Sequence, residues 1–426
     1  MKRRLAAAGI VLAITGMVGA APVPSPVPAA EVDPVRAAQY WLDDYGIRDA
    51  WQTTRGEGTR IAVIDTGVAR GPAELSGVVD GADFSGLGSP DGRTPVGAVD
   101  SAHGSLVASL AAGRGTGPDT GVIGVAPAAE VLSLSLAFGA AAASPFVDQV
   151  ADAMRWAVDH GADVINLSFT TNTLDWPERW DEAFLYALEH DVVVVVAAGN
   201  RGSGTDRVGA PATIPGVLTV GGVDRSGAAS VEASTQGITI GVSAPSEDLL
   251  GVSPDGQVVL WNGTSGAAPI VAGVAALVRA AHPDLDAANV INRIVKTAKP
   301  APGGGVNPLL YGSGLIDAAA AVSAPVAAVA QNPMGDLREW IRVFRRADAA
   351  PQPEPSVAPV EVPPLPAPEA ASRATSPLLP SESTLLYGTL PLTVVTVAGI
   401  LVALGVTAAA RRIRSARALR QPSRYI

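Results

Sequence analysis

A serine at a strand-to-helix junction is the residue of this chain best placed to act as a nucleophile. Ser265 lies in the stretch GTSGAAP (263–269), between the strand-like segment 258–261 and an Ala/Val-rich helical run. Small neighbours leave its hydroxyl accessible, and the N-terminus of a helix favours the negative charge that develops when a carbonyl is attacked. By itself the stretch is equally compatible with an ordinary turn or helix cap.

Two further motifs supply a carboxylate and an imidazole. The apolar run of RIAVIDTGV ends at Asp65, at the tip of a buried parallel strand, where α/β folds place functional groups. His103, one of four histidines, opens a small-residue helical run. Taken singly, Asp65 is compatible with a turn and His103 with a helix cap. Together the three groups can form a triad, in which His103 takes the serine proton and Asp65 orients the ring.

The three motifs, IAVIDTGV, HGSLVA and GTSGAAP, resemble those of the subtilases, the subtilisin-like serine peptidases, which share the chain order Asp, His, Ser. The spacings of 38 and 162 residues between the three groups are also similar to the family's. A fourth motif, VVVVVAAGN, ends where subtilases carry an oxyanion-hole asparagine. The resemblance therefore implies this role for Asn200, and such a donor is worth about 3–4 kcal/mol of barrier in subtilisin.

The resemblance covers residues 41–321 and also implies where a protein or peptide substrate is held. In subtilases an extended peptide lies between two strands, which would fall here near 134–139 and 168–171. The substrate-binding candidates are Leu134, Ser135, Leu136, Ser168, Phe169 and Thr170. Phe169-Thr170-Thr171 stands where Leu-Gly-Gly or a close variant is usual, so we expect Thr170 to narrow or reshape the pocket beside the nucleophile. Gly266 is smaller than the usual residue, with a modest expected effect on packing.

We expect no cofactor and no metal in the reaction, because the triad chemistry does not require one. Some subtilases bind structural calcium, but no contiguous loop of this sequence has calcium-ligand spacing. The absence of cysteine excludes disulfides and thiol catalysis. A formal charge of −10 argues against nucleic acid as a partner.

Apolar runs and helical patterns alternate along the chain. This alternation predicts an α/β domain over 59–325, with a subtilisin-like parallel sheet and helices on both faces. We expect strands at 61–64, 131–136, 164–167, 192–197 and 217–223, and helices at 104–112, 147–160, 180–190, after Ser265 and at 287–298.

The two ends of the chain predict its location. Residues 1–20 combine a basic start, an apolar run and a small-residue cleavage site, which together indicate a secretory signal peptide; an uncleaved anchor is the alternative. Residues 385–410 are predicted to form a transmembrane helix and 411–426 a basic cytoplasmic tail, the alternative being a buried helix of a soluble domain. Both signals predict a single-pass protein of the cell membrane with its catalytic domain outside the cytoplasm.

Two connecting segments complete the organisation. The N-terminal extension, 21–58, is too short for the folded propeptide of many subtilases, so we expect no independent inhibitory domain. The segment 326–384 is predicted to be a proline-rich linker, with 349–380 as a semi-rigid spacer. Within it, 336–346 has helical periodicity and is interpreted as a surface helix or a docking site.

This organisation resembles the mycosins, membrane-anchored subtilases associated with type VII secretion systems. Residues 40–51 resemble the mycosin extension that wraps the catalytic domain, although mycosins commonly carry disulfides and this chain cannot. The resemblance implies a peptidase that processes exported proteins, with secretion-complex subunits as possible partners. Two alternatives remain: a structural subunit that stabilises the complex, with proteolysis secondary, and a general degradative protease.

Overall fold

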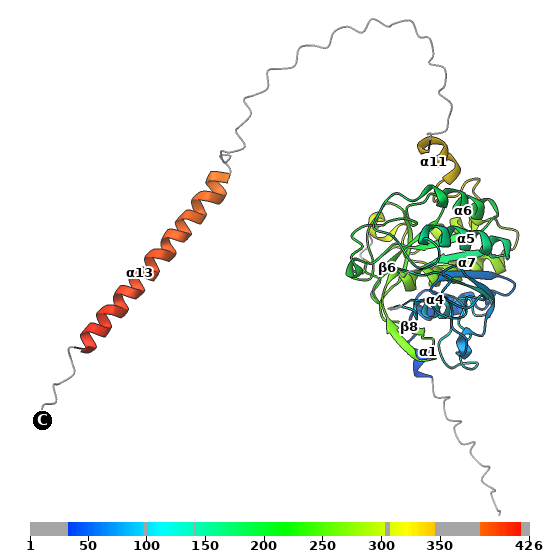
Figure 1. Ribbon diagram of the computed structural model, residues 1–426, viewed down its shortest axis with the longest axis horizontal. Coiled ribbons are helices and arrows are strands. Elements are labelled where there is room, and N and C mark those ends of the chain that lie inside the picture. The colour runs from blue at the N-terminus through cyan, green and yellow to red at the C-terminus, as the bar shows by residue number, and fades with distance from the viewer. Residues whose placement is uncertain (1–32, 98–99, 140–141, 303–306, 346–383, 419–426) are drawn as a thin grey trace, which may run out of the picture. The chain divides into compact units, whose positions relative to one another are not determined.

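The computed structural model describes residues 33–97, 100–139, 142–302, 307–345 and 384–418. The chain divides into two units, Met1–Ala349 and Ala350–Ile426, and each is described by itself (Figure 1). The helices of the first unit are α1 (Pro34–Ala38), α2 (Trp41–Asp44), α3 (Ile47–Ala50), α4 (His103–Ala112), α5 (Phe146–Asp159), α6 (Glu178–Glu189), α7 (Thr264–Ala281), α8 (Ala287–Lys296), α9 (Pro308–Tyr311), α10 (Ala318–Ser323) and α11 (Leu337–Phe344), with short 3-10 turns η1 (Ala73–Leu75) and η2 (Arg201–Ser203).

A seven-stranded parallel sheet forms the centre of the first unit, in the order β2-β3-β1-β4-β5-β6-β7. Its strands are β1 (Arg60–Asp65), β2 (Val78–Asp83), β3 (Glu130–Ser135), β4 (Val164–Leu167), β5 (Val193–Ala197), β6 (Leu218–Val223) and β7 (Ile240–Pro245). In β1, Ile61 lies opposite Val131 of β3 and Val164 of β4. β2 and β3 lie on one side of β1, and the later strands β4 to β7 lie on its other side. The order of the strands therefore changes direction at β1, and α/β folds bind ligands at such a switch point.

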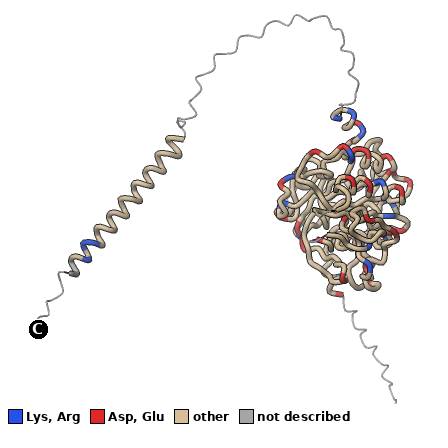
Figure 2. Tube along the Cα trace, viewed as in Figure 1, with Lys and Arg blue, Asp and Glu red and all other residues tan. Residues whose placement is uncertain are grey.

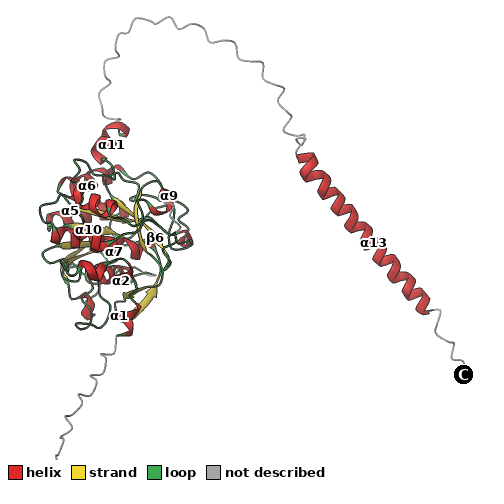
Figure 3. Ribbon diagram, turned by 180° about the vertical axis from the view of Figure 1, so that it is seen from behind, coloured by secondary structure: helices red, strands yellow, loops and turns green. Residues whose placement is uncertain are grey.

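Helices cover both faces of this sheet, as the sequence predicts (Figures 1 and 3). On one face, α4 and α7 pack together over a core that includes Val107 and Ile270. On the other, α5 and α6 pack over Met154 and Phe184. Strands with both faces covered consist of continuous apolar runs, which is why their positions could be predicted.

Three strands, β2, β7 and β8 (Leu249–Val252), were not predicted from the sequence. The edge strand β2 has the mixed sequence VVDGAD and is partly exposed, so it lacks a continuous apolar run. The strand β7 at the other edge contains Gly241 and ends at Pro245. The expected strand 258–261 exists as β9 (Val258–Trp261), but it pairs antiparallel with β8 (Leu249–Val252) in a hairpin outside the main sheet.

The N-terminal extension, described from residue 33, is attached to the domain by buried hydrogen bonds. The Gln39 side-chain amide donates to the Ile123 carbonyl (2.8 Å) and accepts from the Ile123 N–H (3.0 Å). Arg36 donates to the carbonyls of Thr120 and Gly121. Trp41 of α2 is fully buried in the core that contains α4 and α7. This part of the extension is therefore built into the fold.

The packed part of the first unit extends past residue 325, the expected end of the domain. Helix α11 lies against the domain through the buried Leu337, and its Trp340 ring lies 4.3 Å from that of Trp176. Arg345, which follows the helix, donates to the Asp181 carboxylate and to the Trp176 carbonyl, both at 2.8 Å. Of the two interpretations of 336–346, the structure supports the surface helix.

The second unit is described from residue 384 to 418. It consists of a π-helical turn, η4 (Leu385–Thr389), and α13 (Leu390–Ala418). The stretch Leu385–Ser415 is long and apolar enough to cross a membrane, and its side chains are exposed. Lys and Arg occur only near one end of this helix (Figure 2), and the helix continues through Arg411 and Arg414, beyond the expected end at 410. The predicted signal peptide and the spacer 349–380 lie outside the described residues.

Candidate active site

Asp65 and His103 are in direct contact at the carboxyl end of the central strand. The Nδ1 atom of His103 lies 2.8 and 2.9 Å from the two Asp65 carboxylate oxygens. Asp65 is fully buried, whereas the His103 side chain is 25% exposed. Because a carboxylate accepts and does not donate, Nδ1 carries the proton and Nε2 is the free basic atom of the neutral ring.

Thr66 and two glycines hold the aspartate strand and the histidine helix together. The Thr66 hydroxyl accepts from the Gly104 N–H (2.8 Å) and donates to the Ser101 carbonyl (3.0 Å), which ties the start of α4 to the end of β1. The Thr66 N–H also donates to Asp65 Oδ1 at 2.7 Å. A Cβ atom on Gly104 would lie 2.5 Å from the carbonyl oxygen of Gly67. The two backbones can approach this closely only because Gly104 lacks a side chain.

Ser265 lies in the first turn of α7, where backbone N–H groups have no acceptor within the helix. Its cap, Gly263, has φ +143°, and a Cβ there would lie 3.0 Å from Asn200 Nδ2. Gly266 is explained by the hairpin: a Cβ at this position would overlap Leu249, which is fully buried against it. The small residue after the nucleophile therefore makes room for β8.

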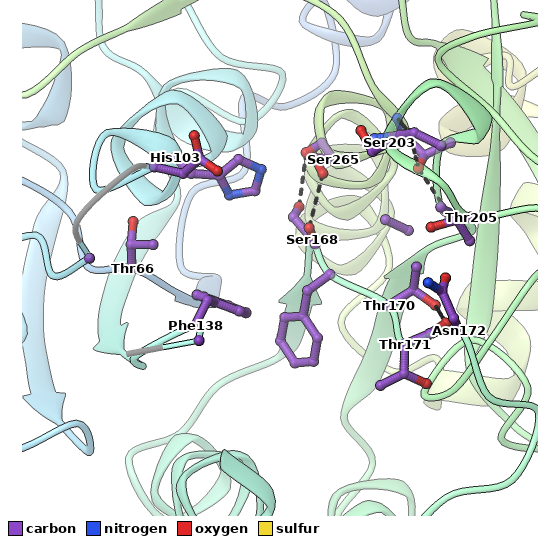
Figure 4. A pocket seen from close by; sticks show the side chains of 18 of the residues that line it. Thr66, His103, Phe138, Ser168, Thr170, Thr171, Asn172, Ser203, Thr205 and Ser265 are labelled. Carbon is purple, nitrogen blue, oxygen red and sulfur yellow. Dashed lines mark hydrogen bonds between the residues drawn. The ribbon is translucent and has the colours of Figure 1, made fainter. Parts of the chain in front are cut away.

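The Ser265 hydroxyl faces the cleft but does not contact the imidazole. It donates to the Ser168 carbonyl (3.0 Å), while the Ser168 hydroxyl donates to the Ser265 carbonyl (2.9 Å). Among the described contacts none joins Ser265 Oγ to His103, whose ring lies on the other side of the same cleft (Figure 4). Catalytic hydrogen bonds are often long in free enzymes, and a rotation about the serine Cα–Cβ bond is required before proton transfer.

Asn200 is oriented by Thr264, the residue before the nucleophile. Asn200 Oδ1 accepts from the Thr264 N–H (2.8 Å) and from the Thr264 hydroxyl (2.9 Å). That hydroxyl in turn accepts from the Gly199 N–H at 3.0 Å. The amide oxygen therefore already accepts two hydrogen bonds. The Nδ2 group can donate to a substrate in the cleft that Asn200 lines. Thr264 was not among the predicted site residues, although it lies within the GTSGAAP motif.

Two opposing effects set the pKa of His103. Burial disfavours the imidazolium and lowers the pKa, but the charge of Asp65, its hydrogen bond and the charge of Asp100 together raise the pKa above its ordinary value of 6.5. The His103 ring also lies edge-on to Trp261, with ring centroids 5.8 Å apart. The charges of Asp65 and Asp100 favour the protonated ring that forms after a proton has been taken from an alcohol.

Comparison with known proteins agrees with this geometry. The sequence profile of the Subtilase family matches residues 56–314. The chain belongs to the subtilase family. Among its relatives in Mycobacterium tuberculosis, Mycosin-4 is 37% identical over 317 residues, which cover 64% of this chain and 66% of Mycosin-4. Mycosin-1 is 36% identical over 339 residues, which cover 66% of this chain and 73% of Mycosin-1.

A solved structure also shows similarity to the mycosins. The crystal structure of MycP1 from the ESX-1 type VII secretion system aligns with a TM-score of 0.59 and 31% identity, over 69% of this chain and 88% of that one. The mycosin-like, subtilisin-like fold is thereby confirmed, and the domain is that of a serine endopeptidase. The match to Mycosin-4 spans slightly less than two thirds of that relative.

The active-site cleft of this subtilase has a volume of about 630 Å³. It is lined by the catalytic candidates His103 and Ser265, by Asn200 and by the expected substrate-binding residues Ser168, Phe169 and Thr170. Leu134, Ser135 and Leu136 are fully buried, and their side chains do not line the cleft. The chain that continues from β3 supplies Phe138 and Gly139 to the lining instead.

An aromatic cluster contributes Phe138 and Phe169 to the lining of the cleft, and the sequence analysis identified only Phe169 of its members. The rings of Phe138, Phe146 and Phe169 lie in mutual contact, with centroids 5.3–5.4 Å apart. They come from three separate segments, so no local pattern groups them. In the part of the chain that the structure describes, no group of three or more His, Asp or Glu side chains is placed to hold a metal ion.

Proposed function

We propose that this subtilase is a membrane-anchored, extracytoplasmic serine endopeptidase that processes proteins exported by a type VII-like secretion system. The observation that carries the catalytic part is the Asp65–His103 pair, which shares one cleft with Ser265 and with the oriented amide of Asn200. The secretion context rests on similarity to proteins of that description, namely MycP1 from the ESX-1 type VII secretion system.

Each residue of the cleft has a defined role in the proposed reaction. After rotation of its side chain, Ser265 gives its proton to His103 Nε2 and its oxygen attacks the peptide carbonyl. Asp65 holds the ring and stabilises the imidazolium. The Nδ2 group of Asn200 and the Ser265 N–H donate to the oxyanion. His103 then returns the proton to the leaving amine, and water repeats the sequence to release the acyl group.

The location is supported by the second unit. The stretch 385–415 is exposed, its residues 385–410 carry no charge, and arginines follow at 411, 412 and 414. Positive residues beside a span remain in the cytoplasm, which would put the catalytic domain on the other side of the membrane. The predicted signal peptide gives the same topology.

Replacement of Ser265 tests this proposal. The full-length chain should be labelled by a fluorophosphonate and should cleave exported proteins, and Ser265→Ala should lose both properties. Ser226→Ala is a matched control, since Ser226 lies in a surface turn away from the cleft and should retain full labelling. Equal labelling of the wild type and the Ser265→Ala variant would refute the assigned nucleophile.

Comparison of cells that carry the wild type with cells that carry Ser265→Ala distinguishes a processing enzyme from a structural subunit of the secretion system. If Ser265→Ala cells still export their substrates but no longer trim them, the protein is a processing enzyme. If export continues with Ser265→Ala, trimming is never detected, and deletion of 385–415 abolishes export, the protein acts as a structural subunit. Digestion of casein at rates similar to those for exported proteins would instead indicate a general protease.

A further inference from the structure

The part of the cleft beside Ser265 and Asn200 is partly filled by threonine side chains. A peptide carbonyl attacked by Ser265 must place its oxygen at the Asn200 amide. The side chain of the residue that carries this carbonyl then enters the adjacent space, lined by 168–172, Ala197, Gly199 and Thr205. We refer to this space as the specificity pocket. Its size limits the residue that can precede the scissile bond.

Thr170 extends across this pocket and is held in place. Its hydroxyl donates to the carbonyl of Gly209 (2.9 Å), with longer contacts to the carbonyls of Thr171 (3.2 Å) and Ala210 (3.3 Å). The backbones of these segments are also paired, since the Thr171 N–H donates to the Ala210 carbonyl at 2.7 Å. The Thr170 side chain therefore cannot move aside for a substrate without losing its acceptors.

Thr205 narrows the same pocket from another segment. A Cβ placed on Gly199 would lie 2.8 Å from the Thr170 methyl carbon and 2.5 Å from the Thr205 methyl carbon. Both methyl groups therefore lie beside Gly199, and Figure 4 shows Thr170 and Thr205 on the same wall of the cleft. Thr205 is 8% exposed, and its N–H donates to the Asn200 carbonyl at 3.0 Å, which fixes its position.

We propose that Thr170 and Thr205 restrict cleavage to bonds that follow a small residue, namely glycine, alanine or serine. This inference rests on the proposed peptidase function and adds the substrate class to it. A larger side chain would have to displace two restrained methyl groups, and forced overpacking of this kind is costly in closely packed sites. Glycine at position 170 would remove the side chain that extends from 168–172 toward Gly209.

Peptide p-nitroanilides that differ only in the residue before the scissile bond test the inference. The full-length protein should cleave the alanine substrate with a kcat/KM about 100-fold or more above that for phenylalanine. Thr170→Gly should raise kcat/KM for phenylalanine by about 10-fold or more relative to kcat/KM for alanine. Thr53→Gly, the same exchange on an exposed loop outside the cleft, should leave the ratio unchanged.

Two milder variants keep the test informative if the glycine variant does not fold. Thr170→Ser keeps the hydroxyl that bonds to Gly209 and removes only the methyl group, and Thr205→Ser removes the second methyl. Each substitution should raise kcat/KM for the leucine and phenylalanine substrates relative to kcat/KM for the alanine substrate. A wild-type protein that cleaves phenylalanine and alanine substrates within threefold of one another, or variants with unchanged ratios, would overturn the inference.

Failure of the proposed function gives a different result. Active-site titration with a fluorophosphonate measures the reactive Ser265 independently of the pocket. A protein that is labelled but cleaves after large residues contradicts the pocket assignment alone. A folded protein that is neither labelled nor able to hydrolyse any substrate of the series contradicts the peptidase function itself.

Discussion

In the proposed reaction, the protonation state of His103 determines whether the cleft can react. The neutral ring is the form that accepts the serine proton. Burial opposes the imidazolium, but Asp65 and Asp100 outweigh it and raise the pKa of His103 above 6.5. Since a raised pKa keeps the ring protonated to a higher pH, the active form is populated only on the alkaline side of that value.

The pH profile of kcat/KM should therefore fall on acidification through a midpoint above 6.5. Asp100→Asn should move this midpoint to lower pH, since it removes one of the negative charges that raise the pKa of His103. Asp49→Asn, an exposed aspartate of α3, should leave the midpoint unchanged. A wild-type midpoint at or below 6.5 would contradict this account of His103.

At the scale of elements, the N-terminal extension behaves as part of the domain. The Gln39 amide is 1% exposed and satisfies both backbone groups of Ile123, as a neighbouring strand would. The extension also donates the Trp51 indole N–H to the Val125 carbonyl at 2.7 Å. Buried backbone groups that lose their partners are expensive, so these contacts fasten the extension to the catalytic domain.

Gln39→Ala should lower the free energy of unfolding by about 1–3 kcal/mol for each Ile123 group left without a partner. Gln52→Ala removes an exposed glutamine of the same extension and should change stability by less than about 0.5 kcal/mol. Urea denaturation followed by circular dichroism measures both variants. Equal effects of the two substitutions would show that the extension contributes little through Gln39.

At the scale of the whole molecule, the chain combines a packed catalytic unit with one apolar helix. The uncharged stretch of 21 residues at 390–410 matches the roughly 20 residues that span a bilayer. Its side chains are exposed, unlike those of α7, which is similarly apolar but buried in the core. An exposed apolar helix of this length is typical of a membrane span.

A chain that ends after residue 383 should therefore be soluble, whereas the full chain should sediment with membranes and resist carbonate extraction. Fluorophosphonate labelling of Ser265 should be the same in both forms, because residues of the first unit alone line the cleft. Removal of 419–426 is the control and should leave the membrane association intact. Sedimentation of the shortened chain with membranes would show that another segment anchors it.

The class of the fold and the groups of the candidate site could be predicted from the amino-acid sequence alone. Asp65, His103, Asn200 and Ser265 each stand at the end of an apolar strand or at the start of a helix, and such local patterns are visible along one chain. Alternating periodicities likewise predicted the parallel sheet with helices on both faces. The edge strands β2 and β7 were missed because edge positions relax the demand for a continuous apolar run.

Which side chains come into contact depends on how the distant segments pack in the folded protein. Thr264 orients Asn200 across 64 residues, and Leu249 occupies the space that makes Gly266 necessary. The direction of the Thr170 hydroxyl, the burial of Leu134 and Leu136, and the packing of α11 depend in the same way on segments distant in sequence. Periodicity and spacing report how each segment folds locally, whereas the shape of a pocket is set by contacts between segments, which no local pattern encodes.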